Sequence, residues 1–258
     1  MAPAPSAAPP DFVRLAAHPL RWRLLTALAE SDRRVRELVH GVGEPQNLVS
    51  YHLRLLRDGG LVTASRSSHD GRDSYYHLDL DRCSDSLTRT GAALHPALRL
   101  DHAAPGPAAR RPRSRRTSVL FVCTGNSARS PVAEAILRQR VGDAVTVTSA
   151  GTRPKDTLHP GAVRALSETL GIDIAGQRPR ALDRLAQRRY DLVVTLCDKA
   201  RESCPDLPSH PRRVHWSIAD PATATDGYAA FQRTVTEIDT RVRHLVPVLA
   251  DPPKEIQP

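Results

Sequence analysis

The run VLFVCTGNSARSP, at residues 119–131, constrains the fold of this chain more than any other stretch. Four apolar residues lead into Cys123, a turn containing Gly125 and Asn126 follows, and a helical pattern begins near Pro131. Such an apolar run is typical of a buried parallel strand, and proline is favoured in the first turn of a helix. The segment therefore predicts a strand–turn–helix unit in which Gly125 and Asn126 take positive φ angles.

A turn between a strand and a helix directs backbone N–H groups and the positive end of the helix at one point, which makes an oxyanion site. Cys123, at the edge of this site, would be held as a thiolate, the nucleophilic form of cysteine. The guanidinium of Arg129 would hold a tetrahedral oxyanion. The loop predicted to bind the oxyanion is Thr124, Gly125, Asn126, Ser127, Ala128 and Arg129.

The Cys-x5-Arg spacing is weak evidence by itself, because arginine is abundant in this chain and the spacing arises easily by chance. The strand before the cysteine, the turn and the helical pattern after it carry the prediction. Together they indicate an enzyme that attacks a phosphate-like anion with sulfur.

The length of 258 residues suits one large domain or two small ones. No apolar stretch approaches the roughly 18 residues that a membrane helix needs, so we expect no membrane association. The opening MAPAPSAAPP lacks the basic start and apolar core of a secretory signal. Four cysteines without such a signal indicate a cytoplasmic protein whose thiols serve catalysis or redox chemistry.

The clearest boundary is a segment rich in proline and arginine at residues 101–117, where alanine is the largest apolar residue apart from proline. This composition predicts an extended linker. It separates a domain at residues 11–100 from a second at 118–250, and residues 1–10 form a disordered tail before the first. The net charge of +9 lies mostly before the second domain, which suggests a polyanionic partner for the first.

Helical periodicity and turn signals predict the elements of the first domain. The expected helices are 11–30, 34–41, 46–58 and 84–100, and the expected strands are 61–66 and 74–78. Three helices, a hairpin and a closing helix form an α+β winged helix-turn-helix domain.

The segments HPLRWRLLTAL and VRELVHGVGEPQNLVSYHLRLLRDGGL, with the hairpin after them, resemble the ArsR-type winged-helix repressors over residues 11–80. The resemblance implies that helix 46–58 enters the major groove of operator DNA. It also implies a homodimer formed by the first and last helices on a two-fold site. The DNA contacts it implies are Gln46, Asn47, Ser50, Tyr51 and His52 at bases or phosphates, Arg54 at the backbone, and Arg66 and Arg72 from the wing.

The cysteines of the first domain depart from this resemblance. ArsR-type arsenic sensors bind arsenite through closely set cysteine pairs or triplets, whereas this domain contains only Cys83. One thiolate is a poor ligand set for a soft metalloid, so we expect no conventional arsenite site here.

In the second domain apolar strand patterns alternate with helical ones, which predicts an α/β fold with a four-stranded parallel sheet. The expected strands are 118–122, 145–149, 191–196 and 213–216, and the expected helices are 130–140, 160–170 and 226–248. Active sites of such folds lie at the carboxyl ends of the strands, where Cys123 is placed.

Two more motifs belong to this edge of the sheet. YDLVVTLCDKARESCP contains Cys197 at a strand end and Cys204 seven residues later. Helix geometry holds such thiols about two turns apart, so they can pair only if the segment rearranges. HWSIADPA places Asp220 on a loop fixed by proline, where a carboxylate can act as a general acid or orient a leaving oxygen. Asp-Pro by itself predicts only a turn.

These motifs, with SAG at 149–151, resemble the low-molecular-weight tyrosine phosphatase fold and its thioredoxin-coupled arsenate reductase branch over residues 118–248. The resemblance implies that Cys123 attacks arsenate held by Arg129, with Ser130 stabilising the sulfur and Asp220 assisting loss of water. Cys197 then attacks Cys123 and releases arsenite, and Cys204 moves the disulfide outward. Thioredoxin or a similar thiol reductant is the co-substrate, and no tightly bound cofactor is expected.

Some relatives of this branch hold a potassium ion through an asparagine, a glutamate, a serine and an acidic residue. Asn126, Glu134 and Ser149 match the first three, but Arg180 stands where the last carboxylate belongs. The sequence therefore predicts no metal site.

Together the two resemblances predict a bifunctional protein, a DNA-binding transcriptional regulator fused to an arsenate reductase. Two alternatives remain open. Phosphatases of this fold share the anion loop and the Asp-Pro but generally lack the second cysteine pair, so a tyrosine or small-phosphate phosphatase tethered to a regulator is one. The other is a repressor whose second domain serves as an oxyanion or redox sensor.

Overall fold

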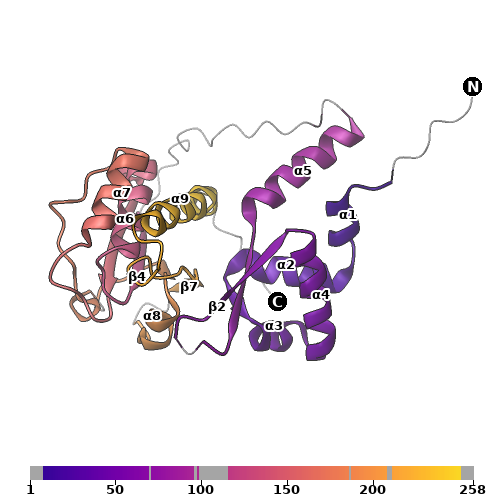
Figure 1. Ribbon diagram of the computed structural model, residues 1–258, viewed down its shortest axis with the longest axis horizontal. Coiled ribbons are helices and arrows are strands. Elements are labelled where there is room, and N and C mark those ends of the chain that lie inside the picture. Colours follow the sequence, from indigo (N-terminus) through magenta and orange to yellow (C-terminus); the bar gives the residue numbers. More distant parts are fainter. Residues whose placement is uncertain are drawn as a thin grey trace, which may run out of the picture. The chain divides into compact units, whose positions relative to one another are not determined.

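The computed structural model describes residues 8–69, 71–95, 98, 116–185, 187–207 and 211–250. The chain divides into two compact units, one holding the elements α1 to α5 and the other holding β4 to α9 (Figure 1). The predicted linker lies outside the described residues except for 116 and 117, as does most of the predicted tail.

The first unit combines five helices with a small antiparallel sheet, among the residues described. The sheet has the order β1-β3-β2, and β2 with β3 forms the predicted hairpin. This is a helix-turn-helix followed by a wing, as predicted. The helices are α1 (Asp11–Ala16), α2 (Pro19–Glu30), α3 (Val35–Val42), α4 (Gln46–Asp58) and α5 (Leu80–Leu94), and the strands are β1 (Arg33–Arg34), β2 (Val62–Arg66) and β3 (Ser74–Leu78).

Three expectations for this unit are corrected. The single helix predicted at 11–30 is wrong, because Pro19 begins a new helix and the His18 side chain caps it by accepting the Leu20 N–H at 3.2 Å. The closing helix starts earlier than predicted, because Asp79 caps it by accepting the Arg82 N–H at 2.9 Å, and it ends at Leu94. Strand β1 was not predicted, since two residues carry no readable period.

The second unit contains a four-stranded parallel sheet of order β5-β4-β6-β7, which confirms the predicted fold class. Helices α6, α7 and α9 pack against one another (Figure 1), and α6 also packs on β4 and β5. The strands are β4 (Thr117–Cys123), β5 (Val145–Gly151), β6 (Leu192–Thr195) and β7 (Arg212–His215); the helices are α6 (Arg129–Val141), α7 (Pro160–Leu170), α8 (Asp198–Ser203) and α9 (Tyr228–Ala250).

The apolar run that led into Cys123 is the centre of this sheet. Val119, Leu120, Phe121 and Val122 are each 0% exposed, as expected of a strand covered on both faces. Because all four strands run parallel, their carboxyl ends lie at one edge, where Val122 pairs with Thr195 and Cys123 with Gly151. This register places the loops after β4, β6 and β7 side by side, and these loops carry the predicted chemistry.

No helix among the described residues is long and apolar enough to cross a membrane.

Candidate functional site

Cys123 is the last residue of β4, and the loop after it folds back over its sulfur. Its side chain is 2% exposed, and the sulfur lies 3.0 Å from the Ser130 hydroxyl. The Asn126 N–H donates to the same sulfur at 3.2 Å. The loop ends where α6 begins at Arg129, so the positive end of a helix faces the cysteine, as predicted.

The loop is held by the side chain of Asn126, which has a φ of +45°. Its amide donates to the hydroxyls of Ser130 at 2.8 Å and Ser149 at 2.9 Å, and its carbonyl accepts the Arg180 N–H at 2.7 Å. The predicted positive φ is confirmed for this residue. For Gly125 it is wrong, because only Asn126 of the pair takes a left-handed conformation.

Sequence analysis missed the structural requirement for a glycine at position 151. A Cβ atom there would lie 2.8 Å from the Thr124 carbonyl oxygen and 3.0 Å from the Asn126 nitrogen. Because these are backbone atoms, they cannot move away from a side chain at position 151. Only glycine therefore allows β5 to pack directly against the anion loop. Its place in the SAG motif at 149–151, directly after the predicted strand 145–149, was the available signal.

Arg129 and Asp220 meet on the far side of the loop. The guanidinium of Arg129 donates to the Ile218 carbonyl at 2.9 Å and to Asp220 at 3.0 Å. The Arg129 side chain is 6% exposed, whereas the Asp220 side chain is 40% exposed. Asp220 also accepts the Ala222 N–H at 3.1 Å, the turn expected of Asp-Pro. The structure therefore brings the predicted arginine and the predicted acid together.

Cys197 also reaches the anion loop. Its sulfur lies 3.3 Å from the Thr124 hydroxyl, and its side chain is buried. It stands immediately before α8, and Cys204, which is half-buried, stands immediately after that helix. The structure thus places two thiols at one loop and the third at the opposite end of a six-residue helix.

The electrostatics of Cys123 differ from the expectation. Burial raises the pKa of its thiol, and the nearby charge of Arg129 and hydrogen bonding with Ser130 only partly oppose this. Burial therefore acts against the expected thiolate, and Arg129 and Ser130 are the groups that favour it. Burial likewise raises the pKa of Cys204, with Arg213 opposing and Asp206 adding to the shift.

A buried polar cluster next to the loop contains Glu134 and Ser149, two of the residues considered above as potassium ligands. The Glu134 side chain is 1% exposed, accepts the Ser149 hydroxyl at 2.6 Å and pairs with the guanidinium groups of Arg138 and Arg180. Arg180 also donates to Ser149 at 3.2 Å. The donor set does not fit a further cation, because a guanidinium already neutralises the carboxylate.

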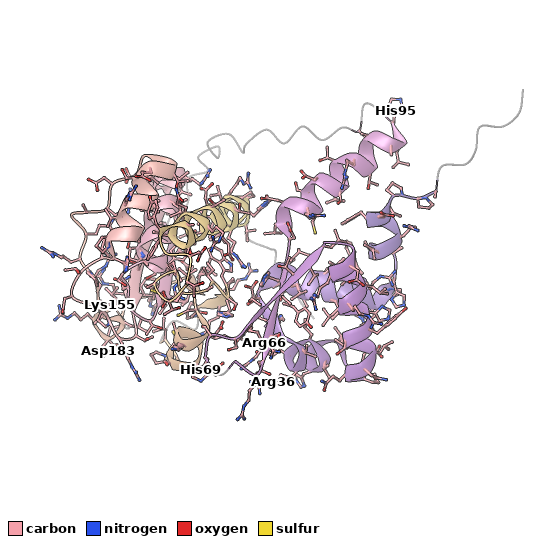
Figure 2. All side chains as sticks on the ribbon, viewed as in Figure 1. Arg36, Arg66, His69, His95, Lys155 and Asp183 are labelled. Carbon is pink, nitrogen blue, oxygen red and sulfur yellow. The ribbon has the colours of Figure 1, made fainter. Side chains whose placement is uncertain are left out.

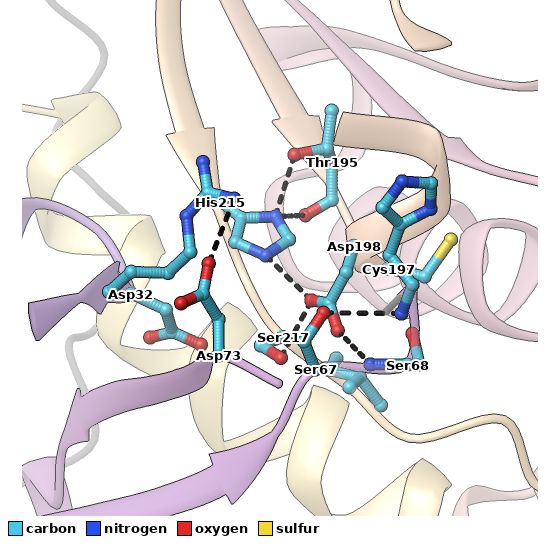
Figure 3. A network of polar contacts seen from close by, with 12 residues as sticks. Asp32, Ser67, Ser68, Asp73, Thr195, Cys197, Asp198, His215 and Ser217 are labelled. Atoms are coloured by element: carbon cyan, nitrogen blue, oxygen red, sulfur yellow. Dashed lines mark hydrogen bonds and ion pairs between the residues drawn. The ribbon is translucent and has the colours of Figure 1, made fainter. Parts of the chain in front are cut away.

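A second network of buried polar contacts fixes the segment around Cys197 (Figure 3). Asp198 accepts hydrogen bonds from His215 Nε2 at 3.1 Å and from the Ser217 hydroxyl at 2.8 Å. The Nδ1 atom of the same imidazole lies 2.9 Å from the Thr195 hydroxyl. Sequence analysis missed this network, because nothing in the spacing of these residues shows that β6 and β7 are neighbours.

In the first unit, α4 has one apolar face and one polar face. Val49, Leu53 and Leu56 are fully buried. The predicted contact residues Gln46, Asn47, Ser50, Tyr51 and Arg54 on α4, together with Arg66 and Arg72 of the wing, are exposed. Figure 2 shows Arg66 and the similarly exposed Arg36 on this unit. The exposed set is available to a partner, as the prediction requires.

The predicted contact His52 belongs to the core instead. It is 5% exposed, and its ring centroid lies 4.4 Å from that of His18. Burial lowers the pKa of His52, and the nearby His18 and Arg21 lower it further. A buried, neutral imidazole on the inner face of α4 cannot contact bases or phosphates in this conformation, so this assignment is corrected.

A parallel sheet whose central strand ends in a cysteine, with an arginine at the start of the next helix, defines a thiol-centred oxyanion site. A sequence profile of the low molecular weight phosphotyrosine protein phosphatases matches residues 118–256, more than half of the chain, and the chain belongs to this family. A profile of the bacterial regulatory protein arsR family matches residues 18–64, which form an ArsR-family helix-turn-helix region.

Similar curated proteins match the second unit. An arsenate reductase of Bacillus subtilis (strain 168) is 43% identical over 129 residues, which is 48% of this chain and 91% of the relative. One of Brevibacillus brevis is 41% identical over 128 residues, 50% of this chain and 92% of the relative. A crystal structure of an arsenate reductase from Archaeoglobus fulgidus DSM 4304 is 33% identical, with a TM-score of 0.43 over 50% of this chain and 98% of that one.

Replacing Ser130 by alanine is expected to raise the pKa of Cys123 further, because the hydroxyl group stabilises the thiolate. A higher pKa lowers the ionised fraction at a fixed pH. Alkylation of Cys123 by iodoacetamide near neutral pH, followed by mass spectrometry, should slow about three- to tenfold, as for the loss of one hydrogen bond. Ser127→Ala in the same loop is the matched control, and equal rates in Ser130→Ala and wild type would contradict the assignment.

Because Arg180 neutralises Glu134, potassium should not stabilise the second unit. We expect equal thermal unfolding midpoints in potassium and sodium chloride at one ionic strength. Arg180→Ala should lower the midpoint in both salts, since the buried carboxylate then loses a partner. The exposed Arg178→Ala is the control. A rise in the wild-type midpoint that is specific to potassium would show that a cation still binds.

Proposed function

We propose that this chain is a DNA-binding transcriptional regulator fused to an arsenate reductase. The observation that carries the reductase is the position of Cys197, whose sulfur lies 3.3 Å from the hydroxyl of the loop residue Thr124. A phosphatase of this architecture needs the nucleophile alone at the loop. A second thiol at the loop and a third behind it are what a redox relay requires.

The first steps take place at the anion loop. Arsenate binds to the loop N–H groups and the guanidinium of Arg129. The Cys123 thiol passes its proton to an oxygen of the bound arsenate, and the resulting thiolate attacks arsenic. A sulfur–arsenic bond forms, one arsenic–oxygen bond breaks, and that oxygen leaves as water after Asp220 gives it a proton. Asp220 is exposed enough to reach the anion and close enough to Arg129 to be positioned by it. Ser130 stabilises the Cys123 thiolate through the 3.0 Å contact with its sulfur.

The redox step follows from the second thiol. Cys197 attacks the Cys123 sulfur, a disulfide forms, and the sulfur–arsenic bond breaks with its electron pair left on arsenic. Arsenic is thereby reduced and leaves as arsenite, while two thiols are oxidised. Cys204 then attacks Cys197 and frees Cys123, and a thioredoxin-like thiol reduces the Cys197–Cys204 disulfide. No tightly bound cofactor takes part in any step.

The DNA-binding part of the proposal rests on α4. Its exposed polar side chains lie opposite a face buried in the core, as expected of a recognition helix. Helix α5 supports the predicted homodimer. None of its residues is buried within a single chain, and its apolar residues Leu87 and Leu94 are exposed, Leu87 by 46% and Leu94 by 76%. Free thiols suit the proposed cytoplasmic location.

Replacing Cys204 by serine distinguishes the proposed arsenate reductase from the alternative that the second unit is a phosphatase. Oxidation of NADPH that depends on arsenate, with thioredoxin and its reductase present, should fall to background, because Cys123 is no longer regenerated. Hydrolysis of p-nitrophenyl phosphate, which needs only Cys123, Arg129 and Asp220, should keep its rate. Cys83→Ser is the control. Turnover that persists in Cys204→Ser would contradict the relay.

The proposed role of α4 in DNA binding is tested by gel-shift measurements of the affinity for promoter DNA taken from upstream of the gene. Asn47→Ala and Arg54→Ala should each weaken binding about tenfold, as for loss of a base or phosphate contact. Lys155→Ala, which removes an exposed charge of the second unit (Figure 2), should have no effect. If both α4 variants bound the promoter DNA as tightly as wild type, the proposal that α4 contacts DNA would be wrong. If the second unit is a sensor, arsenate or oxidation must alter this affinity.

A further inference from the structure

The two ends of α8 are held differently. At its start, Asp198 accepts the hydrogen bonds of His215 and Ser217 at 3.1 and 2.8 Å, and all three side chains are buried (Figure 3). The Nδ1 atom of the same imidazole lies 2.9 Å from the hydroxyl of Thr195, two residues before Cys197. The residues on both sides of Cys197 are therefore tied to one histidine at the end of β7.

The far end of α8 makes exposed contacts. Cys204 follows the helix and is half-buried. Beyond it, Arg213 donates to the Pro205 carbonyl at 2.5 Å and pairs with Asp206 at 3.1 Å, and the Asp206 side chain is 99% exposed. Such contacts compete with water and hold a segment only weakly. The polar contacts in the segment from Cys204 to Asp206 are therefore weaker than those at the start of α8, and the next buried side chain is Leu207.

A disulfide between Cys197 and Cys204 requires α8 to change. Seven residues of helix span about 10 Å, whereas the Cα atoms of a disulfide lie about 4.4 to 6.8 Å apart. Either Cys197 leaves the anion loop or Cys204 comes to it. The hydrogen bonds of the buried Asp198 carboxylate at the start of α8 favour the second movement, because they hold Cys197 in place.

We infer that Asp198 is a positioning residue that anchors Cys197 at the anion loop, so that α8 unwinds from its carboxyl end and Cys204 moves to a stationary Cys197. This inference rests on the proposed three-thiol reductase. In the exchange, the Cys204 thiolate attacks the Cys197 sulfur, the Cys197–Cys204 bond forms and the Cys123–Cys197 bond breaks. Cys123 leaves as a thiolate, and no electrons are gained or lost overall.

The anchor has two consequences for the order of events. A stationary Cys197 stays at the loop that follows Cys123, with its sulfur 3.3 Å from the Thr124 hydroxyl, so its attack on Cys123 should depend on that position. Unwinding also takes Cys204 out of the half-buried surroundings that raise its pKa, which makes its thiolate more available once the helix opens. The first exchange should therefore depend on the anchor, and the second should not.

The test is a single turnover of the full chain without reductant, repeated over a series of arsenate concentrations. Samples are quenched in acid at successive times, and the two disulfides are quantified by peptide mass spectrometry. Asp198→Ala removes the acceptor that His215 and Ser217 share, whereas Asp198→Asn keeps one side-chain oxygen that can accept a hydrogen bond. Ser217→Ala removes one donor, which keeps the test available if Asp198→Ala does not fold. Glu202→Gln, an exposed acid of the same helix, is the matched control.

Asp198→Ala should slow formation of the Cys123–Cys197 disulfide at least about tenfold, the order expected when a reacting group loses its position. Asp198→Asn and Ser217→Ala should lie between it and wild type. Transfer to Cys204 should be no slower, and the arsenate concentration for half-maximal rate should not change. A purely structural effect would instead slow both exchanges together and raise that concentration.

Equal disulfide kinetics in wild type, Asp198→Ala and Ser217→Ala would overturn the anchor while leaving the reductase intact. Loss of both exchanges in equal measure would also overturn it. The absence of any disulfide in wild type after arsenate is added would instead show that the proposed reductase itself is wrong.

Discussion

The reactive end of the sheet depends on the side chain of Asn126. Its amide and carbonyl groups join the loop to Ser130 on α6, to Ser149 on β5 and to the backbone of Arg180. These bonds hold one residue in a left-handed conformation and turn its N–H toward the Cys123 sulfur at 3.2 Å. A buried amide with its hydrogen bonds satisfied fixes one conformation, and a loop that must meet a tetrahedral anion needs that rigidity.

The short segment after β7 connects the two halves of the proposed chemistry. His215 and Ser217 hold Asp198 beside Cys197, while Ile218 and Asp220 accept the hydrogen bonds of Arg129 beside Cys123. Residues 215–220 therefore contact both Arg129, which is proposed to bind the anion, and Asp198, which is proposed to anchor the second thiol. The parallel sheet makes this possible, because it brings the ends of three strands to one edge.

Elements with a strong local periodicity could be predicted from the sequence. The apolar run into Cys123 and the helix at 46–58 have such patterns, so their positions were predictable. Features that depend on a partner far away in the chain could not be predicted. His52 has the same residue type whether it faces solvent or packs on His18, and the pairing of Arg180 with Glu134 required the folded arrangement of α6. The pKa of Cys123 likewise depends on burial, which no spacing reports.

In the proposed reaction, sulfur atoms of this chain supply the two electrons that reduce arsenic. The decisive measurement mixes the fully reduced chain with excess arsenate in the absence of any reductant and counts arsenite and free thiols. We expect about one arsenite per chain and the loss of about two free thiols in the same time course. No arsenite, or arsenite formed without loss of thiols, would contradict it.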